Sequence, residues 1–163
     1  MNIIIVGFIL IITVIFQTTL ASYLALFGVK PDMLLIIVVY LGFKRGPMFG
    51  QMGGFLSGFM EDMFTGNLIG INALSKTIIG NLTGHLKGQL AFENAVTQIV
   101  MIAVATACHV LVSFFAQVIF TSYIPSILAT IRYTVIAFIY NGLLAVLVFA
   151  ILDRMGMARG VER

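Results

Sequence analysis

The sequence predicts an all-α polytopic membrane protein with about six transmembrane helices, and three observations support this. Hydrophobic residues make up 61% of the 163 residues and charged residues only 9%, where a soluble domain carries about 25%. Short turn signals divide the chain into apolar runs, and about 20 such residues cross a bilayer. Glycine recurs at every fourth position through the middle of the chain. A water-soluble fold of this length could not hide so much apolar surface, so we expect the bilayer to be its solvent.

We expect a single integral membrane domain over residues 1–163, with spans at about 3–27, 33–45, 48–64, 68–86, 95–120 and 127–152. The first run lacks a basic leading region and is longer than the apolar core of a signal peptide, so we expect a retained span. The second run is short. It must therefore borrow flanking residues, tilt, or be buried among other helices.

The third run carries the glycine row. The row consists of Gly46, Gly50, Gly54 and Gly58, followed at the same spacing by Asp62, Gly66 and Gly70. Residues four apart lie nearly above one another on a helix, so the first four glycines form a groove that another helix can approach closely. Two interpretations remain open: packing against a helix of this chain, or a binding face for another membrane protein.

Two charged side chains follow the groove. Asp62 ends it, and a charge at the bilayer centre costs about 3 kcal/mol on insertion scales, so we expect a structural partner or a ligand contact for it. The fourth run is unusually polar and includes Asn72 and Lys76, which predicts a position near the protein centre. We expect an ion pair between Lys76 and either Asp62 or Glu61. A proton relay is a weaker interpretation, because it needs several acids in series.

Other polar residues are isolated within apolar runs. We expect His109 to be a hydrogen-bonded packing residue rather than a metal ligand, because no further ligands stand at suitable spacing. Gln17 and Asn141 are predicted to form hydrogen bonds between helices. No nucleophile elbow, phosphate loop, zinc-protease helix or spaced cysteine pair is present, so we predict neither enzymatic activity nor a cofactor or metal. The basic residues are scattered singly, which argues against a nucleic-acid partner.

The basic residues also predict an orientation. Six spans place both termini on one side, together with the second and fourth loops. That side carries Lys44, Arg45, Lys87, Arg154, Arg159 and Arg163, against Lys30 and Arg132 opposite. The positive-inside rule therefore places both termini in the cytoplasm. A re-entrant or merged span would give five spans and remove this argument.

The stretch from Pro31 to about Gly84 resembles the bacterial rod shape-determining protein family MreD. The matching text is PDMLLIIVVYLGFKRGP and then GFLSGFMEDMFTGNLIGINALSKTIIGNLTG. In that family a glycine-rich helix ends in an aspartate and is followed by a Gly-x-x-x-Gly turn and Asn-Ala-Leu. The residues in those places are Gly54, Gly58, Asp62, Gly66, Gly70, Asn72, Ala73 and Leu74.

The resemblance implies a non-enzymatic subunit of the cell-wall elongation machinery in the bacterial inner membrane. Its implied direct partner is MreC, in a complex with the MreB filament, a cell-wall glycosyltransferase and a class B transpeptidase. On this reading the glycine groove and the polar fourth helix form the docking surface, and Asp62 sets its register. The family is also distantly similar to the substrate-binding subunits of energy-coupling-factor vitamin transporters. That alternative is disfavoured because Trp is absent and few aromatic residues lie near the polar groups.

Overall fold

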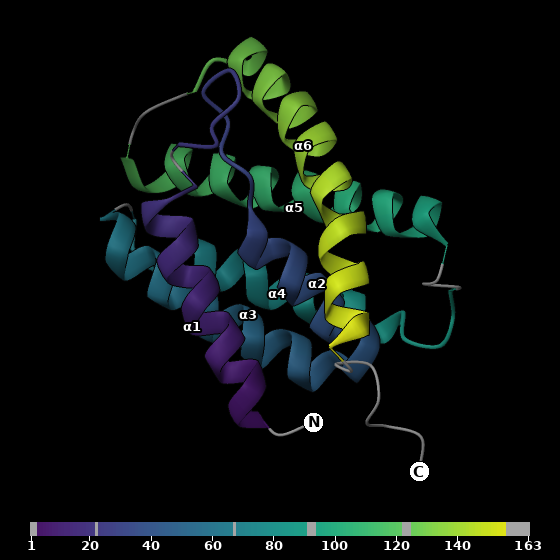
Figure 1. Ribbon diagram of the computed structural model, residues 1–163. Helices are drawn as coiled ribbons and strands as arrows, with labels where there is room; N and C mark the ends of the chain where they lie inside the picture. Colours follow the sequence, from purple (N-terminus) through teal and green to yellow (C-terminus); the bar gives the residue numbers. More distant parts are fainter. Residues whose placement is uncertain (1–2, 22, 67, 91–93, 122–124, 156–163) are drawn as a thin grey trace.

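The computed structural model describes residues 3–21, 23–66, 68–90, 94–121 and 125–155 (Figure 1). These residues form six α-helices and no β-strand. The helices are α1 (Ile3–Thr19), α2 (Met33–Arg45), α3 (Pro47–Thr65), α4 (Ile71–His85), α5 (Ala95–Thr121) and α6 (Ile127–Arg154). The predicted all-helical class and the order of the helices are confirmed, and most predicted bounds lie within a few residues of the observed ones.

Helix α2 lies at the centre and packs against all five other described helices (Figure 1). Every residue from Leu34 to Phe43 is buried. The helix starts at Asp32, whose side chain accepts a hydrogen bond of 2.8 Å from the Leu35 N–H. Burial on all sides explains how a run of only 13 residues can be so uniformly apolar. The sequence analysis allowed this short run to borrow flanking residues, to tilt or to be buried among other helices, and the structure shows that it is buried.

Helices α3 and α4 form a tight antiparallel pair. Pro47 opens α3, where its missing N–H costs nothing. The turn between the helices contains Gly66 and Gly70, which have φ values of 66° and 102° that side-chain-bearing residues rarely adopt. The buried face of α4 includes Ser75, Lys76 and Thr83. The polar fourth helix thus turns its polar face into the protein, as predicted.

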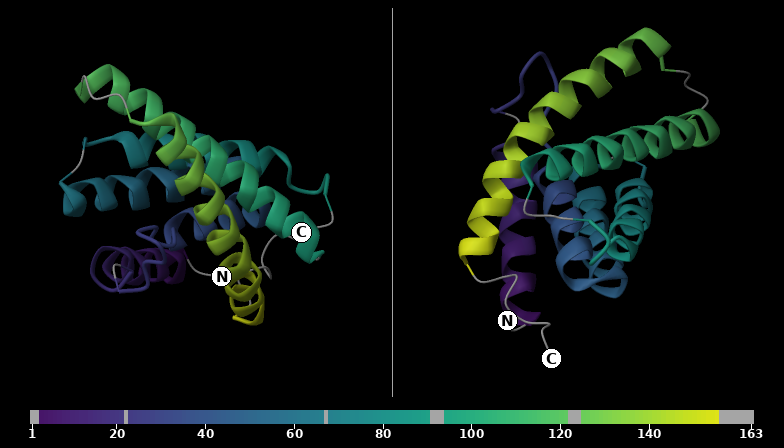
Figure 2. Two further views of the ribbon diagram at one scale, coloured as in Figure 1. Left: turned by 90° about the horizontal axis from the view of Figure 1, so that it is seen from above. Right: turned by 90° about the vertical axis from the view of Figure 1, so that its right-hand side faces the viewer.

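Helices α5 and α6 form the longest pair, and their joined ends reach past the rest of the molecule (Figure 2). They have 27 and 28 residues, and among the described residues these two are long and apolar enough to cross a membrane. The other four helices are shorter or less apolar. Six complete spans and a fold like that of the vitamin-transporter subunits therefore stay predictions.

The first helix is shorter than predicted. It ends at Thr19 instead of continuing to residue 27. After this point the chain turns back, and Gln17 holds the returning segment beside α1: its amide donates to the Pro31 carbonyl at 2.8 Å, and its oxygen accepts from the Met33 N–H at 3.1 Å. The chain between these points folds back in a tight turn in which Leu26 and Val29 exchange backbone hydrogen bonds. A prediction from hydropathy alone continues α1 through this segment, because most of its residues are apolar.

Candidate functional site

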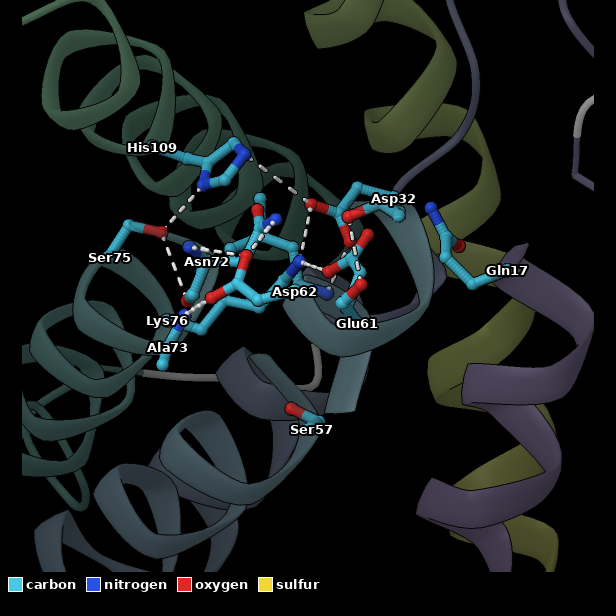
Figure 3. Close-up of polar contacts among 12 residues, drawn as sticks. Gln17, Asp32, Ser57, Glu61, Asp62, Asn72, Ala73, Ser75, Lys76 and His109 are labelled. Carbon is cyan, nitrogen blue, oxygen red and sulfur yellow. Dashed lines mark hydrogen bonds and ion pairs between the residues drawn. The ribbon is translucent and has the colours of Figure 1, made fainter. Parts of the chain in front are cut away.

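A buried ionic network lies where α2, α3 and α4 meet (Figure 3). The Lys76 side chain is completely buried. Its ammonium group forms ion pairs with Glu61 from α3 and, at 3.2 Å, with Asp32 at the start of α2. A buried ion must be paired and hydrogen-bonded to be tolerated. Lys76 therefore ties the three inner helices together at one depth.

Asp62 performs a different task. Its two oxygens accept hydrogen bonds from the backbone N–H groups of Gly70 (2.9 Å), Asn72 (3.2 Å) and Ala73 (3.1 Å), and from the Asn72 side chain (2.8 Å). The first N–H groups of a helix have no partner within that helix, and a side chain just before the helix normally caps them. Gly70 occupies that position and has no side chain. Asp62 of α3 therefore caps α4 from the neighbouring helix.

The predicted ion pair between Asp62 and Lys76 is thus wrong, whereas the alternative counter-ion Glu61 is confirmed. Adjacent residues on a helix point about 100° apart. Asp62 faces the first turn of α4, and Glu61 faces the next turn, where Lys76 lies. The sequence separation alone could not distinguish these two orientations.

The outer helices join this network through polar side chains. His109 Nδ1 lies 2.8 Å from the Ser75 hydroxyl, and its Nε2 lies 3.9 Å from Asp32. Asn141 of α6 accepts from the Asp32 N–H at 2.9 Å and donates to Thr106 of α5 at 3.3 Å. The predictions of a hydrogen-bonded packing histidine and an interhelical Asn141 are confirmed, as is that of Gln17. Through these contacts, polar groups connect all six described helices.

The glycine row has two functions rather than one. Gly50, Gly54 and Gly58 have no room for a side chain, because an added methyl group would overlap backbone atoms of α4. The pairs that meet are Gly50 with Gly80, Gly54 with Lys76, and Gly58 with Asn72. Gly46, Gly66 and Gly70 lie at helix ends with positive φ. The structure thus selects packing within the chain, and α4 occupies the groove that was considered as a face for a partner.

A second polar cluster joins α2 to the end of α6. The Tyr40 hydroxyl donates to Asp153 at 2.7 Å, and Lys44 forms an ion pair with Asp153 at 3.2 Å.

The start of α1 and the end of α6 lie at one end of the molecule (Figure 1). Arg159 and Arg163 lie outside the described residues, and the cytoplasmic placement of the termini stays a prediction.

A cavity of about 970 Å³ borders the ionic network at His109 and lies between the start of α4, the second half of α5 and the first turns of α6. Asn72 and His109 line it, whereas Asp62 does not. The sequence analysis left a ligand contact open for Asp62, and the capping role of this carboxylate explains why it is turned away from the cavity. Among the described residues, no cluster of three or more His, Cys, Asp or Glu side chains could hold a metal ion.

The buried Asp62 cap and the glycine-packed hairpin occupy the residues on which the resemblance depends. A family model for rod shape-determining protein MreD matches residues 1–155 of the 163-residue chain. The chain belongs to the MreD family. Membership supports a role in determining cell shape, and together with the apolar helices α5 and α6 the family indicates a membrane protein. No curated protein and no solved structure matches the chain.

Sequence reasoning gave Asp32 no role in the site. In the structure it pairs with Lys76, caps α2 and donates its N–H to Asn141. One signal was available: an Asp immediately before an apolar run is typical of a helix N-cap. Its pairing with Lys76 could not be seen, because the two residues lie on different helices.

Proposed function

We propose that this protein is a non-enzymatic inner-membrane subunit of the cell-wall elongation machinery, which maintains rod shape by binding MreC and scaffolding the peptidoglycan synthesis enzymes. The observation that carries the proposal is the family match over residues 1–155. The glycosyltransferase, the class B transpeptidase and the MreB filament belong to the same proposed complex.

The internal contacts support a scaffold. Among the described residues, every buried side-chain nitrogen and oxygen atom has a hydrogen-bond partner. The charged residues Lys76, Glu61 and Asp62 are used to fix helices to one another. Satisfied polar networks of this kind make a core rigid and specify one arrangement. A rigid bundle suits a protein whose task is to hold partners in a defined geometry.

The same contacts change where a partner span is expected to bind. Gly54 and Gly58 touch α4, and both carboxylate oxygens of Asp62 already accept hydrogen bonds from backbone N–H groups at the start of α4. We therefore place the MreC span on the outer, lipid-facing sides of the helices. Exposed apolar side chains such as Phe8 and Ile15 on α1 lie on such a side. In a bilayer this association depends on packing and on hydrogen bonds between helices.

Complementation tests the proposal. A rod-shaped bacterium depleted of its own MreD is given this chain, and cell width is measured by microscopy. The chain is expected to restore rods of normal width. A Lys76→Met variant is expected to leave the cells round because the bundle fails, whereas Lys87→Met, which removes an exposed lysine, is expected to restore rods. Round cells with the wild-type chain present in the membrane would contradict the proposed function.

A further inference from the structure

The cavity between α4, α5 and α6 is not explained by a scaffolding role. It measures about 970 Å³ and is lined by residues of three helices and two turns. Ligand sites in proteins enclose about 300–1,000 Å³ and are apolar with a few convergent polar groups, and in bundles they lie between helices. The size and position of this cavity are therefore those of a small-molecule site.

Helix α5 presents a row of polar side chains to the cavity. His109, Ser113, Gln117 and Thr121 follow one another at four-residue spacing and all line it. The row extends for about 18 Å along the helix. Among the described residues, no hydrogen-bond partner is found for the side chains of Ser113 and Gln117. Polar groups within a membrane-spanning segment need partners, because hydrocarbon offers none.

The lining defines the chemistry of an occupant. The described cavity residues include no Lys, Arg, Asp or Glu, so neither a strongly anionic nor a cationic group would find a counter-charge. Amide and hydroxyl side chains both donate and accept hydrogen bonds, which matches a ligand rich in hydroxyl groups. Asn72 and Tyr133 add such groups from the facing walls, and Phe114 supplies an aromatic face. A sugar ring has the matching combination of hydroxyl groups and a weakly polar face.

We propose that this cavity binds an uncharged saccharide group, presented either as the head group of a glycolipid or as a free sugar. The proposal does not rest on the scaffolding role. At its inner end the cavity reaches His109, which also contacts Ser75 and lies beside Asp32. An occupant therefore touches the polar network that joins the helices, and its binding stabilises the whole bundle.

Thermal unfolding with defined probes tests this proposal. The full chain is purified in a detergent without a sugar head group and placed in phosphatidylcholine nanodiscs. The probes are monoglucosyl diacylglycerol, methyl glucoside and the anionic lipid phosphatidylglycerol. A saturating saccharide probe is expected to raise the unfolding midpoint by about 5 °C, because a ligand that binds only the folded state stabilises it by mass action. A shift with the glycolipid alone identifies a lipid source, and a shift with methyl glucoside identifies a soluble one.

Two variants make the test specific to the cavity. Gln117→Leu removes a hydrogen-bonding side chain from the α5 row and is expected to weaken probe binding about tenfold. Gln89→Leu makes the same change at an exposed residue outside the cavity and is expected to bind as the wild type does. The proposal is overturned if neither saccharide probe shifts the midpoint, if phosphatidylglycerol does so equally, or if Gln117→Leu binds normally. It is also overturned if Gln117→Leu abolishes recovery of a partner protein while no probe binds, because a partner helix then occupies the cavity.

Discussion

At the residue scale, Lys76 is the centre of the ionic network. It is completely buried and is shared by two carboxylates that come from different parts of the chain. Charged residues inside a membrane protein often mark a transport or proton pathway. Here the described contacts of Lys76, Glu61 and Asp32 join helices, and this geometry favours a structural role.

Replacing Lys76 is therefore expected to be severe. Lys76→Met leaves Glu61 and Asp32 without their cation and is expected to destabilise the protein by about 3–5 kcal/mol. Thermal unfolding in nanodiscs measures this. Adding Glu61→Gln to Lys76→Met removes one of the orphaned charges and is expected to recover part of the loss. Equal stability of Lys76→Met and Lys87→Met would contradict the assigned role of Lys76.

Asp62 gives a more local prediction. Asp62→Asn replaces one accepting oxygen with an amide that faces N–H donors, and is expected to cost about 2 kcal/mol. Hydrogen exchange should become faster at the backbone N–H groups of Asn72 and Ala73, which donate to Asp62 in the wild type. Asp153→Asn, at the far cluster with Tyr40, is the matched control and should leave these amides protected. Unchanged protection in Asp62→Asn would contradict the capping role.

The sequence predicted the character of these residues better than their partners. A lysine inside an apolar chain requires a counter-ion whatever the fold, so its buried pairing could be expected. The choice of Glu61 over Asp62 depends on a rotation of about 100° around α3, and the contribution of Asp32 depends on tertiary packing. Neither is encoded in local spacing.

At the scale of elements, the fit between α3 and α4 is the main determinant. Glycines on both helices allow their backbones to touch, and in a membrane such close packing replaces the hydrophobic effect as the source of helix association. Helix α4 can then place Lys76 and Asn72 directly beside the carboxylates of α3. Close approach and charge pairing thus depend on each other.

A matched pair of substitutions tests this fit. Gly54→Ala places a methyl group against the backbone of Lys76 and Thr77, and is expected to cost about 1–3 kcal/mol through overpacking. Gly7→Ala makes the same change on α1, where nothing lies within 4 Å of the added carbon, and is expected to be neutral or slightly stabilising. Unfolding midpoints compare the two. A Gly54→Ala protein as stable as Gly7→Ala would contradict the packing role of the row.

The elements themselves were largely predictable. Turn residues such as Pro47 and Gly66 mark helix ends by local chemistry, and the observed bounds follow them. The end of α1 was missed because the apolar segment after Thr19 turns back, and Gln17 then contacts Pro31 and Met33. The occupant of the glycine groove was left open, because spacing shows that a helix can approach but not which one does.

At the scale of the whole molecule, the protein is a helical bundle whose polar groups are used internally and whose exposed surface is largely apolar. Buried ionic and amide contacts connect the short inner helices to the long pair α5 and α6. This arrangement leaves apolar outer faces, where we propose that a partner binds, and the cavity between α4, α5 and α6, where we propose that a small ligand binds. The cavity was not foreseen, because its walls come from segments that are far apart in the sequence.

Recovery of MreC with this chain is the most direct test of the central claim. The tagged protein is isolated from gently solubilised membranes of cells that it maintains as rods, and the bound proteins are identified and quantified by mass spectrometry. The account predicts MreC in an amount comparable to that of the chain, retained in Lys87→Met and lost in Lys76→Met, whose bundle is expected to fail. Absence of MreC, or recovery of an ATP-binding transporter module in its place, would contradict it.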